Sequence, residues 1–252
     1  MSAAVQTILE TRGLSRHFKG FVAVNDVSIK VQRGHIHALI GPNGAGKTTM
    51  FNLLTKFLRP SAGQVFYNGA DITNAGPAQT ARMGIVRSFQ ISAVFPHMTV
   101  MQNVRIALQR ELGVSFQFWR SRQMLDVLND KAVGLLEQVD LARFADSPAV
   151  ELPYGRKRAL EIATTLALEP ELLLLDEPTQ GMGHEDVGRV MELIKRVSAQ
   201  RTVLMVEHNM NVVSRIADRI TVLQRGAVLA EGAYAEVSRD PRVIEAYMGT
   251  VH

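Results

Sequence analysis

The chain has no cysteine, and this absence excludes several kinds of site at once. Disulfide scaffolds, iron–sulfur clusters, cysteine-based zinc modules and a thiol nucleophile all need a residue type that the sequence lacks. Long apolar runs are missing as well, because stretches such as Leu172–Leu175 have strand length and a membrane-spanning helix needs roughly 20 residues. We therefore expect no helix that crosses a bilayer. Residues 1–10 contain no basic segment followed by a long apolar one, so we expect no secretory signal there.

Charge of either sign is not in large excess. Lys and Arg total 28 against 24 Asp and Glu, and a formal net charge of +4 over 252 residues does not by itself indicate nucleic-acid binding. Apolar residues make up 46% of the chain and charged residues 21%, which excludes intrinsic disorder and provides material for a sizeable core. The chain is therefore expected to fold as one or two globular domains.

Apolar periodicity predicts the order of strands and helices. Two alternating runs, Ile8–Leu14 and Val24–Val31, indicate antiparallel strands near the start of the chain. Helical spacing dominates from about Thr99 to Leu168, and strand-like runs then alternate with helical ones up to Leu223. Alternation of this kind predicts an α/β fold with a largely parallel sheet and helices on its faces.

Polar residues follow directly after several predicted strands. They are Gln90, Asp176, Glu177, Glu207 and His208, and a glycine-rich segment follows Ile40 in the same way. In open parallel sheets, ligands bind beyond the carboxyl ends of the strands. Separate regions of the sequence are therefore expected to converge on one shared site.

The glycine-rich segment matches the phosphate-loop pattern of glycine, any four residues, glycine, lysine and then serine or threonine. Gly44 and Gly46 would let the backbone turn its N–H groups toward phosphate oxygens, at the positive end of the following helix. Lys47 would add a charge between the outer phosphates, and the hydroxyl of Thr48 can bind Mg²⁺. An ordinary glycine turn is the alternative, which the preceding strand and following helix disfavour. The expected nucleotide-binding residues here are Gly41, Pro42, Asn43, Gly44, Ala45, Gly46, Lys47, Thr48 and Thr49.

A second segment, Leu172–Glu177, predicts the hydrolytic half of the site. A buried strand that ends in Asp176 can place this carboxylate near a metal ion, usually through a water molecule. The adjacent Glu177 can accept a proton from an attacking water or orient it. The alternative is an acidic pair in solvent, but the phosphate loop upstream makes nucleotide hydrolysis the favoured interpretation.

At this point the sequence resembles the ATP-binding subunits of ABC transporters over nearly its whole length. The matching motifs are Walker A at Gly41–Thr48, the Q-loop at Gln90, the signature position at Leu152–Arg156, Walker B at Leu172–Asp176, Glu177, and the switch histidine His208. Four further segments resemble the branched-chain amino-acid importer subfamily: Ile40–Thr49, Ala81–Gln90, Val206–Met210 and Pro241–Gly249.

The resemblance implies a fold and a division of the chain. The fold would be a P-loop NTPase (RecA-like) core with a parallel sheet, an N-terminal antiparallel β subdomain and an inserted α-helical subdomain. Residues 1–252 would form a single ABC ATPase domain. Its nucleotide-binding core would comprise residues 1–90 and 169–252, and residues 91–168 would form the helical subdomain with the signature segment.

The resemblance also implies roles for individual residues. ATP and its Mg²⁺ would be bound, with Thr48, Gln90 and Asp176 near the metal and the phosphate-loop residues and Gln90 on the nucleotide. The catalytic residues would be Glu177, His208 and Lys47. Phe18 would stack on adenine, or else be a core aromatic between two early strands, and His208 could be an incidental loop histidine. His35 and His37 have no third ligand at a recognisable spacing, so no other metal is expected.

Two segments depart from the family pattern. Where the family has Leu-Ser-Gly-Gly-Gln, this chain has Leu152, Pro153, Tyr154, Gly155 and Arg156, so the serine hydroxyl is absent and Pro153 has no N–H. Arg156 at a helix start is one compensation, since arginine suits phosphate oxygens. Residues 179–184 lack the usual serine and aspartate of the dimer contact. We therefore expect the site closed by Pro153 to be weaker than the site built on Lys47 and Glu177.

The implied function is that of an ATP-hydrolysing subunit that dimerises head-to-tail. It would power membrane subunits that move a small polar solute into the cell, a branched-chain amino acid or a related compound. The implied partners are transmembrane permease subunits, a second ATPase subunit that is identical or different, and indirectly a periplasmic solute-binding protein. The chain would be peripheral, at the cytoplasmic face of the inner membrane, and no nucleic acid is expected.

Two alternatives stay open. One is a non-transport ABC protein that acts on nucleic acid or ribosomes, to which Phe116, Phe118 and Trp119 among basic residues could contribute a face. A solvated helix start is the favoured interpretation of that cluster. The other alternative is a nucleotide-responsive clamp with little turnover, suggested by Pro153.

Overall fold

The computed structural model describes residues 6–88, 94–109 and 122–248, with the side chains of 122–127 and 248 left aside. Gln90 and the cluster at Phe116, Phe118 and Trp119 lie outside these residues. The chain divides into two compact units, of which the first comprises Met1–Arg87, Glu171–Pro178 and Ser198–His252. Within the described ranges, no helix is long and apolar enough to span a membrane.

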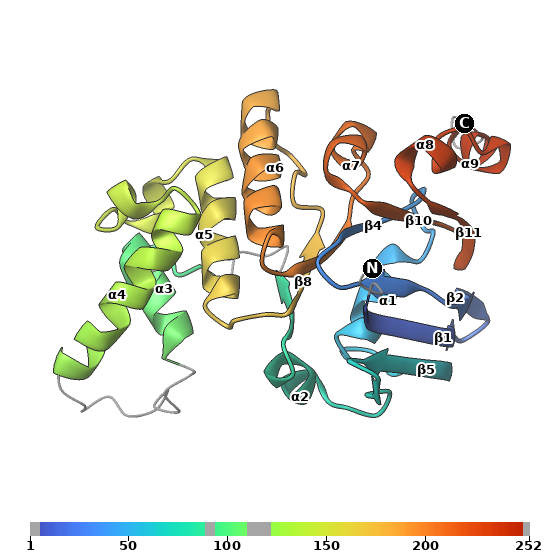
Figure 1. The fold of residues 1–252 in the computed structure, drawn as a ribbon, viewed down its shortest axis with the longest axis horizontal. Coiled ribbons are helices and arrows are strands. Elements are labelled where there is room, and N and C mark those ends of the chain that lie inside the picture. Colours follow the sequence, from blue (N-terminus) through green and yellow to red (C-terminus); the bar gives the residue numbers. More distant parts are fainter. Residues whose placement is uncertain (1–5, 89–93, 110–121, 249–252) are drawn as a thin grey trace, which may run out of the picture. The chain divides into compact units, whose positions relative to one another are not determined.

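The first unit contains the predicted parallel sheet (Figure 1). Its strand order is β11-β10-β4-β9-β8-β7, with parallel pairing of β10 with β4, β4 with β9, and β9 with β8, and antiparallel pairing of β10 with β11. The strands are β4 (Ile36–Ile40), β7 (Ile85–Ser88), β8 (Leu172–Asp176), β9 (Thr202–Val206), β10 (Arg219–Gln224) and β11 (Ala227–Gly232). Every residue of β4, β8 and β9 is buried, which explains why they are near-continuous apolar runs.

A second, antiparallel sheet is formed by the N-terminal residues, as predicted. It has the order β2-β1-β5-β6, and β3 also pairs with β1. Its strands are β1 (Thr7–Phe18), β2 (Phe21–Val27), β3 (Lys30–Gln32), β5 (Ala62–Tyr67) and β6 (Ala70–Asp71). The expected single strand at 24–31 is divided in two, because β2 pairs with the second half of β1 and β3 with the first half. Asp26, with a φ of 52°, lies near the end of β2, just before this division.

The helices of the first unit connect these strands and cover the apolar core. They are α1 (Lys47–Leu54), α2 (Pro77–Arg82), α7 (Met210–Ile216), α8 (Tyr234–Val237) and α9 (Pro241–Met248). Met50, Phe51 and Leu53 of α1 belong to one buried cluster with residues of both sheets, such as Leu39 and Val65. This packing fixes α1 and therefore the loop that precedes it.

The second unit, Ser88–Pro170 with Thr179–Val197, is helical in its described part. It holds α3 (Val100–Leu108), α4 (Arg122–Gln138), α5 (Tyr154–Leu166), α6 (His184–Ser198) and the 3₁₀ turns at Ala142–Phe144 and Ala149–Glu151. α3, α4 and α5 all lie within the stretch of helical spacing expected from about Thr99 to Leu168. The structure groups most of α6 with these helices, whereas the sequence division placed it in the nucleotide-binding core.

His37 on β4 gives the first unit a specific dependence on pH. Its side chain is fully buried, and its Nε2 lies 2.8 Å from Oγ1 of Thr221. Burial, with a smaller contribution from the charges of Arg219 and His35, lowers its pKa from 6.5 to about 3. Between these values the unfolded chain binds a proton that the folded chain does not bind. The contribution of neutral His37 to the stability of the folded chain is therefore complete above about pH 6.5 and is lost as the pH falls below this value.

We therefore expect the free energy of unfolding to fall below pH 6.5 with a slope to which His37 contributes about 1 kcal/mol per pH unit. Urea denaturation at a series of pH values measures this slope. His37→Gln should flatten it, whereas His17→Gln, at an exposed position of β1, should leave it unchanged. Equal slopes for the wild type and His37→Gln would show that another group carries the effect.

Candidate functional site

Three of the expected polar segments meet at the carboxyl edge of the parallel sheet. The glycine-rich loop follows β4, Asp176 and Glu177 lie at the end of β8, and His208 comes two residues after β9. These strands are direct neighbours in the order β4-β9-β8. The backbone N–H of Glu177 also donates to the carbonyl of Val206 at 2.9 Å, which joins the ends of β8 and β9.

The glycine-rich loop has the geometry of an anion cradle. Gly41 and Gly46 have φ angles of 151° and 101°, and no side chain caps the N-terminus of α1 after Gly46. The first backbone N–H groups of a helix have no partner within the helix, and the helix dipole favours negative charge at this end. Thr48 is exposed in the first turn of α1. The loop therefore suits a phosphate, with a hydroxyl beside it.

Lys47 lies across the opening of the same loop. Its ammonium donates to the carbonyl oxygens of Gly41 at 2.6 Å and Pro42 at 3.0 Å. Burial lowers the pKa of Lys47, and the carboxylates of Glu177 and Asp176 act in the opposite direction. The lysine charge is thus held between the loop and the two acidic residues, where it can meet the outer phosphates of a nucleotide.

Asp176 is buried and forms an ion pair that the sequence reasoning missed. Nη2 of Arg87, from β7, bonds to Oδ2 of Asp176, and Nη1 of Arg87 bonds to Oδ1 of Asn52 at 2.6 Å. The sequence does contain a sign of this ion pair, because Arg87 is a cation inside the apolar run 85–89. A buried charge requires a partner, which could have pointed to Asp176.

Glu177 and His208 face each other at the end of β8 and β9. Nδ1 of His208 lies 3.8 Å from Oε1 of Glu177, with about half of the histidine side chain exposed. Glu177 has a φ of 44°, an uncommon conformation for a residue with a side chain. Glu207, which is fully buried, accepts hydrogen bonds from the N–H groups of His208 and Asn209 at 3.0 and 3.1 Å. This carboxylate, to which the sequence reasoning gave no role, fixes the backbone that carries His208.

Phe18 lies at the end of β1, opposite Phe21 of β2. Its side chain is 40% exposed, and the guanidinium carbon of Arg16 is 4.7 Å from the centre of its ring. The exposure excludes the alternative of a core aromatic. Stacking on adenine stays a prediction for this residue.

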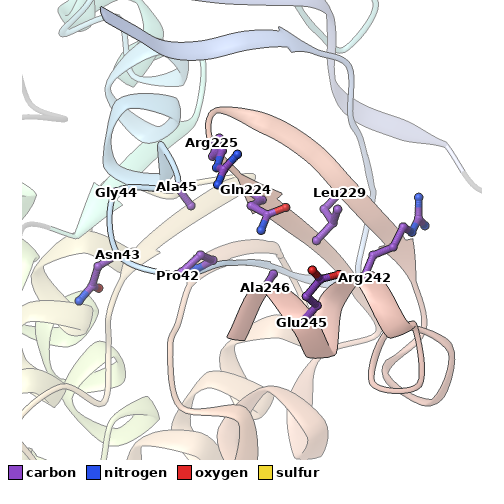
Figure 2. A pocket seen from close by; sticks show the side chains of 10 residues that line it. All are labelled: Pro42, Asn43, Gly44, Ala45, Gln224, Arg225, Leu229, Arg242, Glu245 and Ala246. Atoms are coloured by element: carbon purple, nitrogen blue, oxygen red, sulfur yellow. The ribbon is translucent and has the colours of Figure 1, made fainter. Parts of the chain in front are cut away.

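A hollow of about 530 Å³ lies beside the glycine-rich loop, and Figure 2 shows the side chains that line it. Residues from the β10–β11 hairpin and from α9 line it beside Pro42, Asn43, Gly44 and Ala45. On the same helix, burial raises the pKa of Tyr247 to about 12, and the backbone of Gly41 acts in the opposite direction. The C-terminal helix α9 therefore lies beside the loop, a proximity that sequence spacing does not reveal.

The signature segment lies in the second unit, at the start of α5. Leu152 is buried, Pro153 is the N-cap, and Tyr154 is exposed. The guanidinium carbon of Arg156 lies 4.1 Å from the ring centre of Phe144, and that of Arg143 lies 4.8 Å from the same ring. The arginine expected to compensate for the missing serine is thus stacked on an aromatic ring.

Gly155 lies against the side chain of Asp186 within the second unit. A Cβ at this residue would lie 2.7 Å from the carboxyl carbon of Asp186, in the first turn of α6. A larger residue at this position of the signature segment would therefore displace the side chain of Asp186.

Comparisons with known proteins agree with these features. Residues 24–180 match the family described as "ABC transporter", and residues 227–252 match the "Branched-chain amino acid ATP-binding cassette transporter". The high-affinity branched-chain amino acid transport ATP-binding protein BraF of Pseudomonas aeruginosa is 39% identical over 253 residues, which cover 96% of this chain and 98% of the relative. The corresponding protein LivG of Escherichia coli K12 is 37% identical, with coverage of 97% and 98%.

Solved structures give the same result. The ADP conformation of MJ1267, an ATP-binding cassette of an ABC transporter, superimposes with a TM-score of 0.86 at 32% identity. The match covers 97% of this chain and 99% of that chain. The predicted fold class is therefore confirmed.

Proposed function

This chain belongs to the ABC transporter ATP-binding proteins of the branched-chain amino-acid subfamily, and we propose that it hydrolyses ATP to drive uptake of a branched-chain amino acid or a related solute. It is an ABC transporter ATPase and binds ATP. The proposal adds the solute, the direction of transport and the arrangement as one half of a head-to-tail pair. Transmembrane permease subunits and a second ATPase subunit are the proposed direct partners, at the cytoplasmic face of the membrane. A periplasmic solute-binding protein would act through the permease.

One observation supports hydrolysis most strongly. The phosphate loop, the acidic pair and the histidine come from three adjacent parallel strands and lie at the same edge of the sheet. In this arrangement Lys47 and the N–H groups of the loop bind and orient the phosphates. Glu177 accepts a proton from the attacking water, and His208, beside Glu177, contacts the terminal phosphate.

The residues present also suit the Mg²⁺ of the nucleotide. A hydroxyl and a carboxylate are the oxygen ligands that this hard cation prefers, and Thr48 and Asp176 supply them. Asp176 is ion-paired with Arg87, and this pairing offsets part of the energetic cost of burying a charged carboxylate. Bound Mg²⁺ would neutralise charge on the phosphates during transfer. Gln90 is proposed as a further ligand on the resemblance alone.

The signature segment supports a proposal of unequal sites in the pair. Pro153 offers no N–H, and Arg156 is engaged with Phe144, so this segment has fewer groups for a phosphate held by the other subunit. The site built on Lys47, Asp176 and Glu177 would be the active one, if the partner provides an ordinary signature.

The test is purification of the tagged chain from its native membrane. We expect permease subunits, a second ATPase subunit and a solute-binding protein to co-purify, and the complex to release phosphate from MgATP with stimulation by the solute-loaded binding protein. Ribosomes or DNA in their place would contradict the proposal in favour of a non-transport protein. A complex that binds ATP without phosphate release would indicate a clamp instead.

A further inference from the structure

Arg87 bonds to Asp176, one of the residues proposed to hold Mg²⁺, and to Asn52 on the helix that carries another, Thr48. One guanidinium nitrogen bonds to Asp176 at the end of β8, and another bonds to Asn52 on α1. Asn52 lies four residues after Thr48, so both lie on the same face of α1. The bridge Asn52–Arg87–Asp176 therefore links the helix that carries Thr48 to the strand that carries Asp176.

The environment of Arg87 restricts its orientation. Only 11% of its side chain and 5% of that of Asp176 is exposed, and its guanidinium carbon lies 5.6 Å from the ring centre of Phe51 on α1. Arginine presents its donors in a rigid planar fork, which suits one residue that must bind two acceptors in fixed directions. Lysine carries the same charge but has no such fork.

We propose that Arg87 is a positioning residue for the metal site: anchored on Asn52, it fixes the carboxylate of Asp176 relative to Thr48, so that both can bind one Mg²⁺. This rests on the proposed role of Asp176 and Thr48 as metal ligands. Mutation of a residue that orients a metal ligand in this way commonly lowers metal affinity by about 10- to 100-fold. The rival explanation is that Arg87 only neutralises a buried carboxylate, a role that any cation would fill.

The test measures Mn²⁺ binding to the full-length chain saturated with a non-hydrolysable ATP analogue, by the loss of the free-ion spin-resonance signal. Arg87→Lys retains the charge and should weaken Mn²⁺ binding about 10-fold. Asn52→Ala should weaken it less, because Arg87 still reaches Asp176. The variant that carries both changes should bind Mn²⁺ no more weakly than Arg87→Lys alone, because both changes break the same bridge.

Arg33 offers a matched control. It also bonds to one carboxylate and one side-chain amide, those of Glu171 and Asn68, but at the other end of β8. Arg33→Lys should leave Mn²⁺ binding unchanged. Nucleotide affinity in the presence of EDTA should be the same for the wild type and Arg87→Lys, because the positioning role concerns the metal only.

The outcomes separate this inference from the proposed function. Asp176→Asn should weaken Mn²⁺ binding, and if it does not, the proposed metal site and the role of Arg87 are both wrong. If Asp176→Asn weakens binding but Arg87→Lys binds Mn²⁺ like the wild type, only the role of Arg87 is overturned. Additive effects in the double variant, or an equal loss of metal-free nucleotide affinity, would likewise contradict it.

Discussion

Replacing Glu177 with glutamine is expected to lower ATP turnover of the assembled complex by about 10²-fold or more. Glutamine has nearly the same size but cannot accept a proton at neutral pH, so the attacking water loses its base. Nucleotide binding should persist, because the phosphate contacts come from the loop before α1 and from Lys47. Phosphate release and equilibrium binding of ATP, measured on the same preparation, separate these two effects.

The control is Glu171→Gln, which changes an exposed carboxylate directly before β8 and should preserve turnover. Complexes with two different ATPase subunits extend the test to the proposed inequality of the sites. Glu177→Gln should then abolish most of the turnover, and the equivalent change in the partner should matter less. If Glu177→Gln leaves turnover intact while the partner's change abolishes it, the active site is the other one.

Much of the site could be predicted because the sequence pattern indicates where each strand ends. Apolar runs end where the chain leaves the sheet, and in a parallel sheet these ends share one edge. The structure confirms this arrangement for the loop after Ile40, for Asp176 and Glu177, and for His208. The α/β fold with an antiparallel N-terminal sheet followed from the same periodicity.

Apart from Glu207, which binds the backbone of the two residues that follow it, the residues that sequence reasoning missed act through contacts between distant segments. Arg87 and Asp176 are 89 positions apart, and α9 lies beside the glycine-rich loop although most of the chain separates the two. Periodicity describes which face a residue occupies but not which partner lies opposite. Arg156 illustrates the converse, because its place at a helix start indicated a phosphate contact, whereas the nearby ring of Phe144 holds its guanidinium.

The other large effect is expected from Gly46→Ala in the phosphate loop. Gly46 has a φ of 101°, and a Cβ there would lie 2.4 Å from the backbone oxygen of Ala23. The unfavourable backbone conformation costs about 1–2 kcal/mol. The Cβ would collide with a backbone atom, which cannot rotate away as a side chain can, so the loop and the start of α1 must shift. We expect ATP turnover to fall about 10²-fold or more, because a displacement of this size misplaces the phosphates.

Gly44→Ala separates the two causes within the same loop. Gly44 also has a positive φ, of 77°, but nothing lies within 4 Å of a Cβ built on it. This variant should therefore show only the conformational cost, as a modest decrease in the free energy of unfolding, with much smaller loss of nucleotide affinity than Gly46→Ala. Urea denaturation and ATP binding, measured for both variants, test this difference. Equal loss of affinity would mean that backbone conformation alone shapes the loop and that the approach of Ala23 to Gly46 is incidental.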